Sequence, residues 1–335
     1  MVEGKGFDAI RHAVRVFMHK VWPRVQRLWK RWKPFLSPLL LIAIFVFLGH
    51  SLAAHWQEVR TVRITAAGWA CLAIATGTTL FAHIWTGWVW GWILQELGQP
   101  MSRTWAAQTY LKTNIAKYLP SNVLHLYGRA IAAKDQGTPF AIASLSVLLD
   151  TLLMAAGGVI IGLFCIPRPW LPLAIVAVGG ILLVLHPKIL GPILDRLSQL
   201  KKSGEDKAEA SPQRWLKHYP LGPLLGEMLF VALRGLGFVL TVVALTPISL
   251  QTVPLLVSIF SVGWVLGFVT PGAPGGLGVF ELTVSTLLTQ EGLFEHEPGL
   301  SVGVALSAVA LNRLVSTLAE AIGSLLAFLD ERWAL

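Results

Sequence analysis

Long uninterrupted runs of apolar residues constrain this chain more than any other feature. They lie near 36–54, 66–93, 139–165, 170–186, 222–246 and 300–329. A helix needs about 20 apolar residues to cross a hydrocarbon core of about 30 Å. The runs are continuous and do not alternate apolar with polar residues, as the strands of a membrane β-barrel do. The sequence therefore predicts an all-α polytopic membrane protein with about six full transmembrane helices.

Charged residues are scarce, at 13% of the chain against 54% apolar residues. A soluble globular protein has about 25% charged residues, so the composition excludes a soluble enzyme, a nucleic-acid binder and a disordered protein. Cys71 and Cys165 both lie in apolar runs, and we expect them to be packing residues rather than a disulfide or a metal site. We expect no metal and no cofactor.

The first 35 residues are basic, since residues 1–33 contain nine Lys or Arg and two acidic residues. Apolar residues recur there every three or four positions, which predicts an amphipathic helix. Such a helix is typical of a segment lying on an anionic membrane surface. The alternative is a positive flank that only orients the first transmembrane helix.

The distribution of basic residues predicts the topology of the single membrane domain, residues 36–335. The linker 187–221 contains seven Lys or Arg, whereas the opposite side has only Arg60, Arg63 and Arg168 besides an acidic run. Basic loops stay in the cytoplasm. We therefore expect cytoplasmic N- and C-termini and a location in the plasma membrane, in the sense of a bacterial inner membrane.

Two further segments, 104–133 and 251–289, are moderately apolar but broken by proline and glycine. Each is followed by a predicted span that begins with Leu-Ser and has a charged residue near its middle, Asp150 in one case and Arg313 in the other. This similarity predicts an internal duplication, with repeat 1 at about 104–165 and repeat 2 at about 251–329.

The broken segments are predicted to be re-entrant hairpins. As helices, Trp105–Leu119 and Leu277–Thr289 are only about 22 Å and about 20 Å long. With the predicted topology the first opens from the cytoplasm and the second from outside, which makes the repeats inverted. Interrupted apolar segments at matching positions of inverted repeats indicate a transporter site near the midplane. Two full crossings in place of either hairpin remain an alternative.

A helix is expected to begin at the tip of each hairpin. Asn122 or its neighbour Ser121 is the expected N-cap of one helix, and Pro274-Gly275-Gly276 opens the other, which carries Glu281. Helix N-termini favour anions, so with Arg129 nearby the tips would bind an anionic head group. The alternatives are a simple turn or close packing for the glycines, and a local effect on the helix dipole for Glu281.

Charged residues inside predicted spans form a second set of candidates. A charge there costs about 2.5–3.5 kcal/mol on insertion scales, so each is expected to be paired or to lie in a polar cavity. We expect Asp150 to pair with Arg313, in a binding groove or as a structural ion pair. Arg313 and Glu320 are two helical turns apart and would line one groove. The set is Asp150, Arg234, Arg313 and Glu320.

Three other residues have an ordinary explanation from the sequence. Lys112 and Lys117 could reach toward lipid head groups or contact a substrate. We expect His83 to be a hydrogen-bonded core histidine. Enzyme signatures are absent from the sequence: it has no zinc-type cluster, no phosphate-binding loop with Lys and Ser/Thr, and no serine nucleophile motif.

The broken segments resemble a known family. PGAPGGLGVFELTVSTLL followed by ALSAVALNRLVSTLAEAIG is similar to the membrane region of the lysylphosphatidylglycerol synthase/flippase family, as is KYLPSNVLHLYGRAIAAKDQG. The resemblance covers about residues 36–330. Its motif residues fall on Pro120, Gly128, Arg129, Pro274, Gly275, Gly276, Gly278, Glu281 and Arg313. The tip of the first broken segment departs from the family, because it has the bulky His125 and Tyr127 where a glycine-rich string would be expected.

In two-domain members of that family a cytosolic domain transfers an amino acid to phosphatidylglycerol, and the membrane region moves the product between leaflets. The resemblance implies only the flippase-like part for a chain that reaches Leu335 soon after its last predicted span. It implies a stand-alone lipid translocator whose partner is a membrane lipid. The alternatives are a membrane enzyme acting on a lipid-linked substrate, with Glu281, Asp150 or His125 as reactive residue, and a regulatory partner of a lipid-synthesis enzyme. A homo-oligomer stays open.

Overall fold

The structure is a computed structural model, and it describes residues 63–118, 123–163, 171–184, 186, 188–189, 219–270, 273–290 and 300–333. Within these ranges every regular element is a helix and there is no strand. The predicted all-α fold class is therefore confirmed. The basic segment 1–35, the apolar run 36–54, Asn122 and most of the linker 187–221 lie outside the described residues.

Hydroxyl side chains cap the N-termini of several of these helices. Thr65 accepts a hydrogen bond from the Gly68 amide at 3.1 Å, and Ser102 accepts one from the Trp105 amide at 3.1 Å. Such caps satisfy amides that lack a partner in the first helical turn. The helices are α4 (Ala66–Glu96), α5 (Arg103–Asn114), η2 (Ile115–Tyr118), α6 (Leu124–Asp135), α7 (Phe140–Gly162), α8 (Leu171–Val184), α10 (Leu221–Val243), η6 (Leu250–Thr252), α11 (Val253–Val269), η7 (Pro274–Gly276), α12 (Val279–Thr289) and α13 (Val302–Trp333).

Five helical segments of the described chain are long and apolar enough to cross a membrane: α4, α7, α10, η6 with α11, and α13. Four of them coincide with predicted spans. The run 170–186 instead forms α8, whose 14 residues would extend only about 21 Å. The fifth, α11, was expected to be an arm of a broken segment, but its helix continues without a break as far as Val269. The protein is a multi-pass membrane protein.

The surface of the bundle is apolar, while its interior contains charged residues. Trp69, Leu225 and Leu325 are 61%, 62% and 58% exposed, whereas Asp150 and Glu227 are fully buried. A soluble protein rarely exposes large contiguous apolar patches. This inverted distribution fits a bundle that faces lipid and encloses polar groups.

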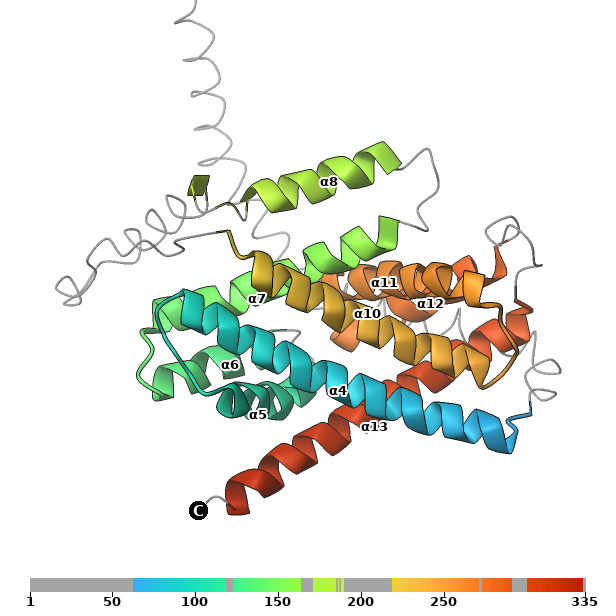
Figure 1. Ribbon diagram of the computed structural model, residues 1–335, viewed down its shortest axis with the longest axis horizontal. Coiled ribbons are helices and arrows are strands. Elements are labelled where there is room, and N and C mark those ends of the chain that lie inside the picture. The colour runs from blue at the N-terminus through green and yellow to red at the C-terminus, as the bar shows by residue number, and fades with distance from the viewer. Residues whose placement is uncertain are drawn as a thin grey trace, which may run out of the picture.

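The described helices form two halves with the same order: a long helix, a hairpin and a second long helix. The first half is α4 to α7 and the second is α10 to α13. In Figure 1 α5 and α6 lie toward one end of the bundle, α11 and α12 lie toward the other, and α4 and α10 run side by side through the middle. Each half has its own apolar cluster, with Trp90, Leu94, Ala106 and Val147 in one and Phe238, Phe260, Phe280 and Val309 in the other.

Equivalent helices of the two halves make equivalent contacts with the other half. The hairpin helix α5 packs against α13 of the other half, and α11 correspondingly packs against α7. The first helices, α4 and α10, pack along each other at the centre. The element order and these contacts are therefore the same in both halves, while the duplication of about 104–165 as about 251–329 stays a prediction. Because each hairpin contacts the last helix of the opposite half, the two halves interlock.

Candidate functional site

A cavity of about 320 Å³ lies where the two halves meet. Both hairpins contribute to its lining, together with the long helices α4, α7, α10 and α13. Four basic side chains line it, Lys117, Arg129, Arg234 and Arg313, and two acidic ones, Asp150 and Glu320. The remaining lining includes apolar side chains such as Leu152, Met154, Trp264, Phe268 and Val269. The cavity is therefore amphiphilic, and basic groups outnumber acidic groups on its wall.

The tips of the two hairpins meet beside this cavity. η2 is in contact with η7, and a β-carbon at Gly275 would lie 3.2 Å from Cε1 of Tyr118. Gly275 and Gly276 have φ angles of +58° and +71°, a backbone conformation that glycine adopts without strain. A β-carbon at Gly276 would also come within 3.1 Å of Gly267. The turn and the close packing considered for these glycines are both present.

Arg313 ties the tip of the second hairpin to α13. Its Nε donates to Oε1 of Glu281 at 2.7 Å, and its Nη1 donates to the carbonyl oxygen of Gly275 at 2.9 Å. The guanidinium also lies over the ring of Phe280, 5.5 Å from its centroid. Arg313 is thereby held at the cavity wall by contacts with two parts of the hairpin.

The N-terminus of α12 differs from the expectation of an open anion site. The helix begins at Val279 with Gly278 as its N-cap, so Gly275 and Gly276 precede it in a turn. Glu281 accepts a hydrogen bond from the Gly278 amide, because a carboxylate in the first turn reaches back to the cap. The local role considered for Glu281 is thus present, and its own carboxylate occupies the end of the helix. On α6 the N-cap is Val123, without a side-chain bond.

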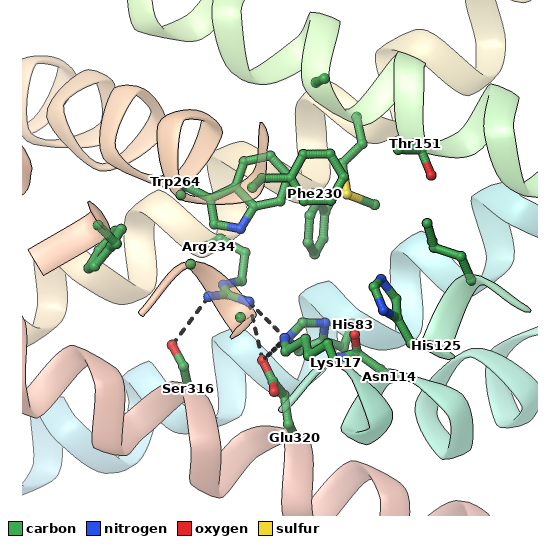
Figure 2. A pocket seen from close by; sticks show the side chains of 18 of the residues that line it. His83, Asn114, Lys117, His125, Thr151, Phe230, Arg234, Trp264, Ser316 and Glu320 are labelled. Atoms are coloured by element: carbon green, nitrogen blue, oxygen red, sulfur yellow. Dashed lines mark hydrogen bonds and ion pairs between the residues drawn. The ribbon is translucent and has the colours of Figure 1, made fainter. Parts of the chain in front are cut away.

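Glu320 of α13 gathers a cluster of basic groups on another wall of the cavity, shown in Figure 2. Its Oε1 lies 2.6 Å from Nζ of Lys117, 3.2 Å from Nε2 of His83 and 3.6 Å from Nη1 of Arg234. Arg234 contacts Nε2 of His83 at 2.9 Å and donates to Oγ of Ser316 at 3.2 Å. One carboxylate therefore faces two cations and a histidine.

Arg129 and Asp150 form an ion pair within the first half. Nη1 of Arg129 lies 2.6 Å from Oδ2 of Asp150, and the side chains are only 4% and 0% exposed. The guanidinium lies over the ring of Tyr110, at 4.6 Å from its centroid. A buried guanidinium between a carboxylate and an aromatic face is well compensated.

The predicted pairing of Asp150 with Arg313 is wrong. Asp150 binds Arg129, and Arg313 binds Glu281. The reason is that the second helix of each hairpin packs on the long helix that follows it, α6 on α7 and α12 on α13. Asp150 and Arg313 therefore each meet a charge on the hairpin of their own half. Arg313 and Glu320 do line one cavity, as their spacing predicts.

Three residues of the site have a larger part than the sequence indicated. Lys117 does not only reach for the membrane surface, since it pairs with Glu320 inside the bundle. His83 is buried and hydrogen-bonded as expected, but it also lines the cavity. Glu227 on α10 is a further buried charge; it lies in an apolar span like Asp150, so the same insertion cost applies to it.

Several buried polar atoms at the cavity have no partner within the part of the chain that the structure describes. They are His125 Nδ1, Glu320 Oε2, Asp150 Oδ1 and His83 Nδ1, and all four residues line the cavity. Buried polar atoms are nearly always satisfied by protein, water or ligand. These four atoms can therefore bind polar groups, water included, that enter the cavity. Among the described residues no cluster of His, Cys, Asp and Glu could hold a metal ion.

No protein-family model and no curated protein matches the sequence.

Proposed function

We propose that this protein moves an amphiphilic lipid with a charged head group, a phospholipid or a polyprenyl-linked or glycolipid molecule, between the leaflets of its membrane. The observation that carries the proposal is the cavity at the hairpin tips, where four basic side chains and an apolar wall lie together. Its composition matches an amphiphile, with an anionic group for the basic side and acyl or prenyl chains for the apolar side.

The head group would bind between Arg313 at the second hairpin and the basic residues Arg234 and Lys117 of the Glu320 cluster. Arginine presents several donors in a fixed plane and suits phosphate oxygens. Arg313 and Arg234 are each held in place by a neighbour, Glu281 in one case and Ser316 in the other. Lys117, 19% exposed at its side chain, adds a third positive charge. Unpaired acceptors such as Glu320 Oε2 would bind hydroxyl or amino groups of the same head group.

The tails would leave the cavity beside the end of α11. Val269 lines the cavity and is 54% exposed, so the lining reaches the outer surface at this point. Its exposed neighbour Leu266 is apolar, as is the exposed Leu148 of α7. A lipid could therefore keep its chains in the bilayer while its head group enters. Rocking of the two halves against each other would then alternate access from either leaflet.

The resemblance of the broken segments to the flippase region of the lysylphosphatidylglycerol synthase family supports the same proposal. The basic linker and N-terminus support an orientation with both termini in the cytoplasm, in a plasma membrane of the bacterial inner-membrane type. Cysteine labelling from each side of intact cells tests this orientation. A cysteine at position 203 of the linker should react only after the cells are opened, and reaction in intact cells would contradict the orientation.

The proposal is tested with purified protein in vesicles that contain fluorescent phosphatidylglycerol and an impermeant quencher. The wild type should expose inner-leaflet lipid to the quencher faster than empty vesicles do. Arg313→Ala and Lys117→Gln should each slow this exchange about tenfold or more, since a hydrogen bond to a charged group contributes about 1.5–3 kcal/mol. Arg103→Ala and Lys134→Gln, at exposed positions of α5 and α6, should exchange lipid like the wild type.

Equal rates for the cavity variants and their exposed controls would contradict the proposed site. If the wild type moves no lipid but converts it to a new species, the protein is an enzyme instead. If it neither moves nor converts lipid, the remaining reading is a regulatory partner of a lipid-synthesis enzyme.

A further inference from the structure

Two carboxyl groups meet deep inside the bundle, behind one wall of the cavity. Asp150 on α7 and Glu227 on α10 are both 0% exposed, α7 packs against α10, and the two carboxyl groups influence each other electrostatically. Asp150 lines the cavity and Glu227 does not. Because α7 belongs to the first half and α10 to the second, this contact joins the two halves.

The hydrogen-bond donors described around these two carboxyl groups are too few for their four oxygen atoms. Oδ2 of Asp150 accepts from Arg129 at 2.6 Å, whereas Oδ1 has no donor among the described residues. The two oxygens of Glu227 share the hydroxyl of Thr86, at 2.8 and 3.1 Å, and a hydroxyl has only one hydrogen to donate. A proton on either carboxyl group supplies the missing donor and forms the hydrogen bond between them.

The charges around the pair also indicate that one proton is bound. Among the described residues, Arg129 from α6 is the cation that the structure places in direct contact with it. Tyr110 from α5 covers that guanidinium, and α4 contributes the neutral Thr86. The described parts of α8 and α11 have no titratable side chain. Further along, Arg234 of α10 pairs with Glu320 of α13, and Arg313 of α13 pairs with Glu281. With one proton the group is neutral. Without it, one buried negative charge has no partner, which is costly away from water.

We propose that the Asp150–Glu227 pair is a proton-binding site, and that one proton is bound and released there for each lipid moved. The inference rests on the proposed function and adds its energy source. A proton enters through the cavity, binds between the carboxyl groups and closes the contact between α7 and α10. When it leaves toward the other side of the membrane, two like charges face each other across this contact and separate the halves. Only a proton is transferred, so no other reactant is needed.

The proton site is tested directly by infrared spectroscopy of the whole protein in lipid. At neutral pH the wild type should show the carbonyl stretch of a protonated carboxylic acid. Glu227→Gln should lose this band, and its amide still donates to Asp150, so the variant should fold. Glu96→Gln, at an exposed position at the end of α4, should retain the band. Absence of the band from the wild type, or its persistence in Glu227→Gln, would overturn the proposal.

Coupling is tested in the vesicles described above, with a pH difference across the membrane and the electrical potential clamped to zero. One proton per lipid predicts that labelled phosphatidylglycerol accumulates in one leaflet, approaching about tenfold per pH unit in the wild type and in Glu96→Gln. Glu227→Gln should show no response to the pH difference. If the wild type exchanges lipid without any response, coupling is refuted while lipid movement stands. If it moves no lipid, coupling fails with the proposed function, and the infrared result alone decides whether the proton site exists.

Discussion

Arg129 and Arg313 show how charged residues are accommodated in the two halves. In the first half the arginine lies on the hairpin helix α6 and its acidic partner Asp150 lies on the long helix α7. In the second half the acid Glu281 lies on the hairpin helix α12 and the arginine on α13. Both ion pairs therefore join the second hairpin helix to the following long helix, but the acidic and basic residues have exchanged positions. Both pairs therefore hold a hairpin against the helix that follows it.

The sequence predicted that each intramembrane charge needs a partner, but not which partner. Insertion cost depends on one residue and its span, whereas pairing depends on how helices are rotated and packed. That is why Asp150 and Arg313 were assigned to each other although both have nearer partners. The same rule was enough to select Glu227, whose span LLGEMLFVALRG contains one acid.

Breaking the Arg129–Asp150 pair should destabilise the fold. Asp150→Asn leaves a buried guanidinium without its carboxylate, and such changes cost about 3–5 kcal/mol. The measurement is the free energy of unfolding of the protein in detergent. Asp135→Asn, at an exposed position of α6, should change it by only about 0.5 kcal/mol. The double variant Arg129→Gln with Asp150→Asn should be more stable than Asp150→Asn alone. An effect of Asp150→Asn no larger than that of Asp135→Asn would contradict this role.

At the scale of elements, proline and glycine located the hairpins, and apolar runs located four of the long helices. The sequence did not predict how long each of the helices is. The described part of the run 170–186 forms α8, Leu171–Val184, and α11 continues to Val269, because the length of a helix depends on local contacts as well as on composition. The sequence predicts that Pro274-Gly275-Gly276 opens the helix and that it covers Leu277–Thr289, whereas α12 begins at Val279, since Gly275 and Gly276 adopt a left-handed turn before it.

Close approach of helices is the element-scale feature most open to test. A β-carbon at Gly87 of α4 would lie 2.6 Å from the Cα of Ala107 on α5, whereas at Gly77 of the same helix it would meet nothing within 4 Å. Small residues allow such approach between membrane helices. Gly87→Ala should lower the free energy of unfolding by about 1–3 kcal/mol, because it forces α4 and α5 apart.

Gly77→Ala is the matched control for this prediction. It should be neutral or stabilising by up to about 1 kcal/mol, since alanine is the better helix former. Thermal unfolding of both variants in the same detergent gives the comparison. If Gly77→Ala is destabilised as much as Gly87→Ala, the contact between α4 and α5 is not what limits position 87.

At the scale of the whole molecule, two similar halves interlock through their hairpins and enclose a cavity at the place where the tips meet. The sequence predicts a duplication because proline, glycine and mid-span charges recur in the same order, and the two halves do have the same order of helices. A groove lined by Arg313 and Glu320 could also be predicted, but the presence of Lys117 and Arg234 in the same cavity could not, since it depends on α5 packing on α13 and α11 on α7. This arrangement is what brings Lys117, Arg234, Arg313 and Glu320 to one space.

Entry of a lipid head group into this space is most directly measured by site-specific photo-cross-linking in native membranes. A small diazirine amino acid replaces Ser316, which lines the cavity, or Ser324, which is buried on the same helix but does not line it. Irradiation followed by mass spectrometry should give, at position 316, an adduct whose fragments retain the lipid phosphate, and none at position 324. Equal lipid adducts at both positions, or only protein adducts at position 316, would contradict a head-group site in the cavity.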